Sequence, residues 1–282
     1  MKNNILKKIN RLDVEIHSKC NRKCSFCPNS DIDRASFNVR LDNTVFIKLL
    51  KSLKANGFSS HICFSRFNEP LADLENLKTK IEITKKFLSK NHISIISNGD
   101  FFSVKNLMGI NVDRVAMMDY DCKGRNKILA KLKNFKGHLV SEENNTLYYQ
   151  IEDGPLVSYK LNWPRHATLE DRGGYLSEPI KHRSVNIPYR NNRKLRDKPC
   201  YDTERRITIE YNGNVMPCCH MRGDIEDHKE YILGNIVNDD IINILNNDKR
   251  KSFIRQTSDT KTLPLPCKFC QKGIPRELPE KN

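Results

Sequence analysis

The sequence lacks any long apolar run. No segment approaches the ~18 consecutive apolar residues of a membrane-spanning helix. The N-terminal residues 1–8 are basic but contain neither the apolar stretch nor the small-residue cleavage site of a secretory signal. We therefore expect a cytoplasmic protein without a membrane partner.

Dense basic runs are also missing, although the formal net charge is +15. A basic face can bind the phosphates of nucleic acid. Here lysine is scattered along expected amphipathic helices, and no aromatic-interleaved RNA motif accompanies it. A solvated basic surface explains the charge. We expect no nucleic-acid partner, and a zinc-stabilised nucleic-acid-binding protein is the alternative of another class.

Cysteine, by contrast, is abundant, with ten residues in the chain. Without a secretory signal, these cysteines favour metal binding over disulfides. Cys20, Cys24 and Cys27 follow a strand-like run in a C-x3-C-x2-C spacing. A 4Fe-4S cluster normally takes four thiolates, one for each iron, so three thiolates would leave one iron open. A structural zinc site with His17 nearby is the alternative.

This cysteine spacing, with Phe26 before the last cysteine, resembles the signature of radical SAM enzymes. The resemblance implies that the open iron binds S-adenosylmethionine (SAM). It also implies a one-electron donor such as flavodoxin or ferredoxin. Asn68-Glu69-Pro70 keeps half of the family's Gly-Gly-Glu-Pro-like segment, and Ser97-Asn98 resembles its ribose-contacting segment. The SAM contacts implied by the resemblance are Phe26, Asn68, Glu69, Ser97 and Asn98.

Strand and helix patterns alternate after the cysteine loop, which predicts an α/β fold with βαβ units around a parallel sheet. Helices are expected at residues 41–53, 74–90 and 126–134, and strands at residues 61–65, 92–96, 112–118, 138–140, 147–150 and 157–160. The resemblance implies a partial (β/α)6 TIM-like barrel, whose active site is surrounded by groups at the carboxyl ends of its strands.

Four candidate catalytic residues follow from this expected barrel. Asp119, Asp121 and Cys122 come directly after a predicted strand. Arg172 belongs to an Asp-Arg-Gly-Gly segment that resembles an Asn-Arg-x-Gly element of relatives. A guanidinium there could pair with the SAM carboxylate or with a substrate oxygen.

A second cysteine group begins at Cys200. Two β-rich runs around Asn212-Gly213 predict a hairpin that leads to Cys218, and helices are expected at 239–245 and 249–256 before the C-x2-C pair Cys267 and Cys270. This pattern resembles the shortened SPASM domain called a twitch domain. The resemblance implies a second 4Fe-4S cluster on these four cysteines, and a zinc ribbon is the structural alternative.

We expect a radical SAM barrel over residues 11–185, a cluster domain over residues 195–275 and a tail over residues 276–282. The resemblance implies that a 5'-deoxyadenosyl radical removes a hydrogen atom from a small polar alcohol of carbohydrate or aminocyclitol type. The second cluster would then accept one electron while a base takes a proton. Further candidates for the base are Tyr120 and His220.

Two alternatives lie within the same enzyme class. An epimerase would need a thiol that returns a hydrogen atom, for which Cys63, Cys122 and Cys219 are available. A peptide (RiPP) maturase often has a leader-peptide-binding domain before the barrel. Here the first strand is expected near Arg11, which favours a small substrate.

Overall fold

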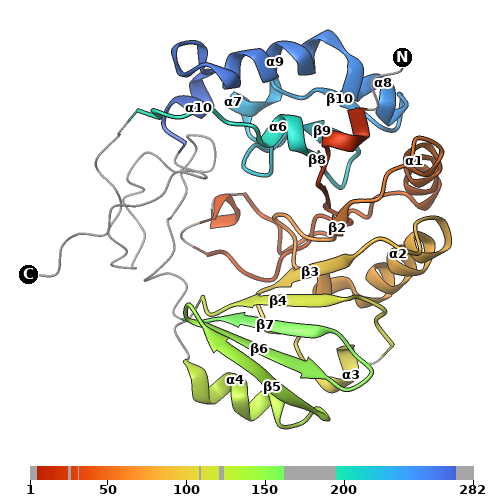
Figure 1. Ribbon diagram of the computed structural model, residues 1–282, viewed down its shortest axis with the longest axis vertical. Helices are drawn as coiled ribbons and strands as arrows, with labels where there is room; N and C mark the ends of the chain where they lie inside the picture. Colours follow the sequence, from red (N-terminus) through yellow and green to blue (C-terminus); the bar gives the residue numbers. More distant parts are fainter. Residues whose placement is uncertain are drawn as a thin grey trace, which may run out of the picture.

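The computed structural model describes residues 5–24, 27–30, 32–107, 109–120, 124–161 and 195–270. Its strands form one ten-stranded sheet in the order β10-β9-β8-β1-β2-β3-β4-β7-β6-β5 (Figure 1). The six central strands, from β8 to β7 in this order, are parallel to one another. They are β8 (Arg206–Ile209), β1 (Arg11–Val14), β2 (His61–Cys63), β3 (Ile93–Ser97), β4 (Arg114–Met118) and β7 (Leu156–Lys160).

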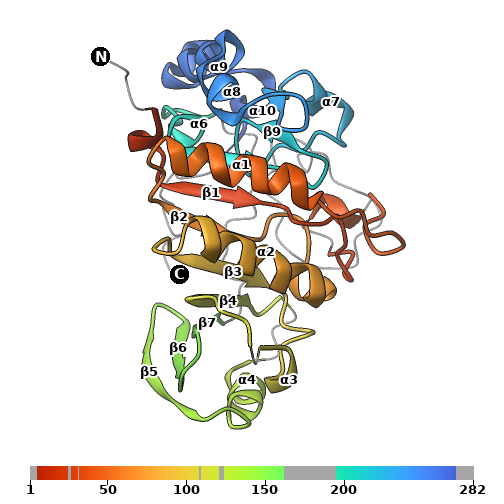
Figure 2. The same ribbon diagram turned by 90° about the vertical axis from the view of Figure 1, so that its right-hand side faces the viewer.

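Two helices cover the outer face of β1, β2 and β3 (Figure 2). These are α1 (Asn43–Ala55) and α2 (Leu74–Phe87). Helix α1 begins where expected because the Asp42 carboxylate accepts hydrogen bonds from the backbone N–H groups of Thr44 and Val45, at 2.7 and 3.1 Å. Its apolar face lies in the core that the strands share with both helices.

Shorter elements connect the strands. The 3-10 turns are η1 (Ile5–Lys8), η2 (Pro28–Ser30) and η3 (Pro70–Asp73). Helices α3 (Val104–Leu107) and α4 (Arg125–Leu132) flank β4 along the chain. Within the described residues, no helix has the length and apolarity needed to cross a membrane.

Residues 137–160 differ from the expected strand-helix alternation. Strands β5 (Gly137–Glu143), β6 (Thr146–Ile151) and β7 form an antiparallel meander. The turn between β5 and β6 is only Asn144-Asn145, both in the left-handed region with φ of 49° and 58°. Two residues can join antiparallel strands, whereas a parallel connection needs a crossover of a dozen or more residues. Only β7 therefore continues the parallel sheet.

The C-terminal part begins with α6 (Asp202–Arg205) and the expected hairpin of β8 and β9 (Asn214–Met216). Gly213, at φ 87°, makes the turn possible. Then come α7 (Glu226–Lys229), β10 (Gly234–Asn235), α8 (Ile241–Asn246), α9 (Asp248–Ser258), η4 (Thr260–Thr262) and α10 (Leu265–Lys268).

Strand β8 pairs in parallel with β1, so the C-terminal hairpin extends the sheet of the barrel. Arg11 lies opposite Arg206 in this register, and Val14 lies opposite Ile209. The C-terminal elements consequently close the sheet on the side of β1, at the opposite end from the meander (Figure 1).

Candidate active site

One cavity of about 240 Å³ brings together seven of the predicted site residues. The first cysteine group, Cys20, Cys24 and Cys27, lines it. The predicted SAM contacts that line it are Asn68, Glu69, Ser97 and Asn98. Three thiols therefore share a cavity with the carboxylate and short polar side chains that the sequence predicted beside them.

Glu69 is the buried carboxylate of this cavity, with a relative exposure of 2%. It accepts hydrogen bonds from the Ser97 hydroxyl at 2.8 Å and from the Asn98 backbone N–H at 2.6 Å. Burial raises the pKa of Glu69 to about 7. The end of β3 thus fixes an acceptor that suits the amino group of a ligand such as SAM.

The loop of the first cysteine group is attached to the end of β3. Arg22 donates from Nε and Nη2 to the two carboxylate oxygens of Asp100, at 2.7 and 2.5 Å. Asn21 donates to Asp100 at 2.7 Å and accepts from the Asn98 side chain at 2.8 Å. The motif analysis missed Asp100, whose one local signal is its place directly after Ser97-Asn98-Gly99.

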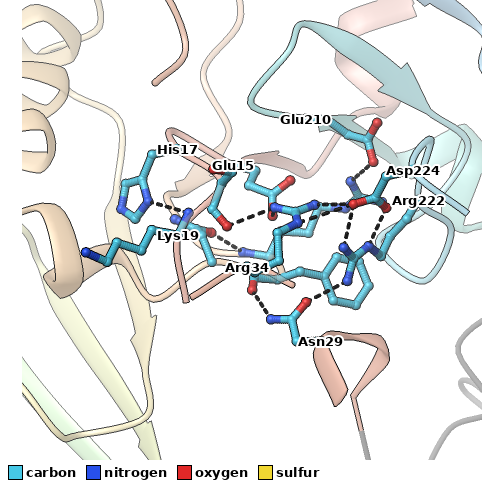
Figure 3. A network of polar contacts seen from close by, with 12 residues as sticks. Glu15, His17, Lys19, Asn29, Arg34, Glu210, Arg222 and Asp224 are labelled. Atoms are coloured by element: carbon cyan, nitrogen blue, oxygen red, sulfur yellow. Dashed lines mark hydrogen bonds and ion pairs between the residues drawn. The ribbon is translucent and has the colours of Figure 1, made fainter. Parts of the chain in front are cut away.

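A buried ionic network supports the loop from the other side (Figure 3). Arg34 donates to the Glu15 carboxylate at 3.1 Å, to the Ser18 carbonyl at 3.0 Å and to Asp224 at 2.8 Å. Although burial alone would raise the pKa of Asp224, Arg222 and Arg34 hold it well below its usual range. The network therefore joins the strand before the cysteine loop to the C-terminal part of the chain.

Arg222 extends this network toward the cavity (Figure 3). It donates to Asp224 at 2.6 Å and to the Asn29 side-chain oxygen at 2.7 Å. Asn29 lines the cavity and donates to the Phe67 carbonyl at 2.8 Å. The residues around both ends of the cysteine loop are thereby positioned by charged side chains that lie far away in the sequence.

The second cysteine group lies in the C-terminal part. Burial raises the pKa of the Cys267 thiol, and its neighbours Cys218, Cys270 and Cys200 raise it further. Cys267 packs in a small apolar cluster with Met216, Met221, Phe253 and Leu263. Cys218, Cys270 and Cys200 therefore lie near Cys267, which packs against apolar side chains.

Backbone hydrogen bonds support these cysteines. The Cys200 N–H donates to the Thr257 carbonyl at the end of α9, at 2.8 Å. Arg196 donates to the carbonyls of Pro199 and Cys270, at 2.9 and 2.8 Å. The two ends of the cysteine group are therefore joined by one guanidinium.

Both cysteine groups fit iron-sulfur clusters by the chemistry of their donors. Thiolates are the usual ligands of 4Fe-4S clusters, and each binds a different iron. Within the described ranges, no three His, Cys, Asp or Glu side chains are grouped around a single metal-ion position. The thiolates of a cluster bind different iron atoms. The thiolates of a zinc site all lie about 2.3 Å from one metal ion.

The predicted catalytic residues differ in where the structure places them. Asp119 is buried and accepts from the Gly124 N–H at 3.1 Å, but it is not among the residues that line the cavity. Tyr120 and Cys219 line it. The other predicted site residues lie outside the described part of the chain: Phe26, Asp121, Cys122 and Arg172.

The remaining candidates, His17, Cys63 and His220, do not line the cavity. The His17 Nδ1 accepts from the Lys19 N–H at 3.1 Å, and the ring does not line the cavity. Cys63 is buried inside the barrel, where burial raises its pKa to about 11. His220 is buried too and lies outside the cavity lining. The cavity-lining arginines that the motifs missed are Arg11, Arg22, Arg66 and Arg206.

Comparison with known families supports the interpretation of the C-terminal part. Residues 200–271 match the SPASM model, described as an iron-sulfur cluster-binding domain. This match confirms the predicted SPASM-type domain and favours iron-sulfur over the zinc alternative.

Known relatives match over most of the chain. The chain is 25% identical over 243 residues to an S-adenosyl-L-methionine-dependent 2-deoxy-scyllo-inosamine dehydrogenase from Niallia circulans, covering 86% of this chain and 84% of that protein. The crystal structure of BtrN in complex with AdoMet and 2-DOIA matches with a TM-score of 0.69 and 22% identity, covering 94% of each chain.

A second crystal structure, of BtrN in an open conformation, matches with a TM-score of 0.55 and 18% identity, covering 89% of this chain and 86% of that one. These structural matches confirm the predicted fold class.

Proposed function

We propose that this chain, which has the fold of BtrN and a SPASM iron-sulfur domain, is a radical SAM oxidoreductase that oxidises a small polar alcohol. The main observation is the cavity that Cys20, Cys24 and Cys27 share with Glu69 beside the C-terminal domain. The relative named as a 2-deoxy-scyllo-inosamine dehydrogenase supports an aminocyclitol-like or carbohydrate-like substrate.

In this proposal, the barrel of residues 11–185 holds one 4Fe-4S cluster through its three cysteines. SAM, once bound, would supply the radical that removes a hydrogen atom from the substrate. Glu69 accepts from the SAM amino group, and its hydrogen bonds with Ser97 and Asn98 keep the carboxylate in place. The Asn98 side chain faces the same cavity and binds the rest of SAM.

The domain of residues 195–275 holds a second cluster through Cys200, Cys218, Cys267 and Cys270. Oxidation of an alcohol to a ketone removes two electrons and two protons from the substrate. The SAM-derived radical would take one hydrogen atom, a base would take one proton, and the second cluster would accept one electron. Among the described candidates for the base, Tyr120 is the one that lines the cavity. A flavodoxin or ferredoxin would supply the electron for SAM cleavage.

Iron content and SAM cleavage test this proposal. Anaerobically reconstituted protein should contain about eight iron per chain, four for each cluster, and should form 5'-deoxyadenosine with SAM and dithionite. Replacing Cys20, Cys24 and Cys27 by alanine should abolish SAM cleavage and leave about four iron. Zinc in place of iron, or loss of all iron in this variant, would contradict two independent clusters.

The matched variant tests the second cluster. Cys267→Ala should remove about four iron and stop net oxidation of the substrate, while SAM cleavage continues. Unchanged ketone formation in this variant would contradict the role of the second cluster as electron acceptor.

One observation favours an epimerase as a second candidate function. Cys219 lines the cavity directly after the proposed ligand Cys218, so a thiol is present where the substrate would bind. In an epimerase, this thiol would return a hydrogen atom to the other face of the substrate radical. Cys219→Ala should then abolish turnover and leave an accumulated substrate radical, whereas a dehydrogenase should keep forming ketone. Incorporation of one deuterium into the product in D2O would identify the epimerase.

A further inference from the structure

Arg66 is a buried guanidinium with open hydrogen-bond donors. Its side chain is 1% exposed, and Nη1 donates to the Glu210 carboxylate at 2.8 Å. Nε and Nη2 are buried without a hydrogen-bond partner among the described residues. Arg66 lines the cavity of the proposed active site. Its planar fork is therefore only partly used by the protein itself.

Asn68 contributes a third open donor to the same wall of the cavity. Its side-chain oxygen accepts from the Arg66 backbone N–H at 3.1 Å, which fixes the orientation of the amide. Its Nδ2 group is buried and has no partner in the described part of the chain. A buried donor without an acceptor costs about 1–3 kcal/mol. Three such donors beside one cavity indicate that a bound group supplies the acceptors.

The other arginines of the cavity are already paired. Arg11 and Arg206 both donate to the Asp13 carboxylate, and Arg22 donates to Asp100. Burial alone would lower the pKa of Arg66, but Glu210 and Glu15 raise it. Burial in turn raises the pKa of Glu15, whose Oε2 also lacks a hydrogen-bond partner among the described residues. Arg66 is thus the cavity-lining arginine whose buried fork has unpartnered donors, and a guanidinium fork binds carboxylate or phosphate best.

The position of Arg66 indicates which ligand it meets. Glu210, directly after β8, accepts from Arg66, and Cys219 of the C-terminal part lines the same cavity as Arg66. Glu69, by contrast, is held by residues at the end of β3. Arg66 therefore lies on the side of the C-terminal domain, where the proposed function places the substrate between the two clusters.

We propose that Arg66 and Asn68 form an oxyanion subsite, and that the substrate carries a phosphate or a carboxylate group beside the alcohol that is oxidised. This inference rests on the proposed function and names its substrate class. The net charge of +15, which the proposed reaction does not otherwise use, would draw an anionic substrate to the protein.

Anion binding to the reconstituted, SAM-loaded protein tests the subsite. Inorganic phosphate and acetate are titrated calorimetrically at constant ionic strength. The double variant Arg66→Gln/Glu210→Gln keeps a neutral hydrogen bond in place of the ion pair and should bind the anion at least tenfold more weakly. Arg114→Gln is the matched control, because Arg114 donates to Ser158 inside the barrel and does not line the cavity. It should bind the anion as the wild type does.

A conservative variant carries the test if the double variant does not fold. Arg66→Lys keeps a charge for Glu210 but lacks the fork, and we expect anion binding to fall about tenfold. The SAM dissociation constant should change less than twofold in either variant. The inference is wrong if the wild type binds neither anion, if the variants bind them equally well, or if SAM affinity falls instead.

Substrate probes separate the two anions and separate this inference from the proposed function. SAM cleavage should be stimulated by an inositol phosphate if the group is a phosphate, or by glucuronate if it is a carboxylate. If only neutral cyclitols stimulate SAM cleavage, the proposed subsite is wrong, but the proposed dehydrogenase function still stands. The protein could also bind phosphate through Arg66 but cleave no SAM under any condition. That result would support the subsite and contradict the proposed function.

Discussion

His17 shows how a single buried side chain makes stability depend on pH. The residue is fully buried, and its Nδ1 accepts a hydrogen bond from the Lys19 N–H. Burial lowers the pKa of His17 to about 4. A protonated ring would turn this acceptor into a second donor facing the same N–H. The folded protein therefore holds His17 neutral just ahead of the cysteine loop.

We predict that this histidine lowers stability in acid. Its pKa is about 6.5 when unfolded and about 4 when folded. The unfolded chain therefore binds more protons, and stability is lost as the pH falls from 6.5 toward 4, by up to about 1.4 kcal/mol per pH unit. Urea unfolding of wild type and His17→Asn between pH 5 and 7 measures the difference. Parallel pH profiles of the two proteins would contradict the prediction.

The residues that the sequence could predict belong to local motifs. Cys20, Cys24 and Cys27 are recognisable by spacing, and Glu69 by the proline that follows it. Arg66 and Asp100 could not be predicted, because their partners are distant in the chain. Arg66 pairs with a residue 144 positions away, and Asp100 with one 78 positions away. Pairing at such separations depends on the topology and leaves no local pattern.

At the scale of elements, periodicity predicted the positions of strands better than their pairing. The predicted strands at residues 147–150 and 157–160 exist as β6 and β7. Their apolar patterns fit a sheet surface in either direction. Direction depends on the connection, and the short turns after β5 and β6 make these strands antiparallel. The antiparallel meander could therefore be predicted only from the length of the connections, not from the apolar pattern of the strands.

The attachment of the cysteine loop to β3 gives a prediction at the same scale. Asp100→Asn removes the charge that holds Arg22 but keeps the shape of the side chain. Charge-assisted hydrogen bonds are roughly twice as strong as neutral ones, so the loop should be held less firmly. We expect the first cluster to lose iron to a chelator two- to tenfold faster, as measured by the decay of visible absorption.

Glu142→Gln is the control for that experiment. Glu142 accepts from Arg125 at 2.8 Å in an exposed ion pair on the edge strand β5. Exposed pairs of this kind contribute about 0–1 kcal/mol, and this one is outside the cavity lining. Iron loss should match the wild type. Equal rates in both variants would show that Asp100 does not hold the loop.

At the scale of the whole molecule, the barrel depends on the C-terminal part. Strand β1 pairs with β8, and the buried Arg34 and Arg66 find their carboxylates at Asp224 and Glu210. Removing these partners would leave an open strand edge at β1, would deprive Arg66 of its carboxylate partner and would leave Arg34 with Glu15 alone. We predict that the fragment of residues 1–194 aggregates, as measured by size-exclusion chromatography.

A cluster-free full-length variant separates two causes of such aggregation. Replacing Cys200, Cys218, Cys267 and Cys270 by alanine removes the proposed second cluster but keeps β8 and its charged partners. This variant should stay soluble if the sheet and the ion pairs matter more than the cluster. A soluble fragment 1–194 that keeps about four iron would show that the barrel folds alone.

The pairing of β1 with β8 also has a consequence for the order of folding during synthesis. Strand β1 leads directly into the cysteine loop, but one of its two neighbours spans residues 206–209. Domains fold as units on the ribosome, and contacts between distant residues form late. The loop should therefore stay accessible until most of the chain has emerged, which gives the iron-sulfur assembly machinery an interval in which to deliver the first cluster before the cavity closes.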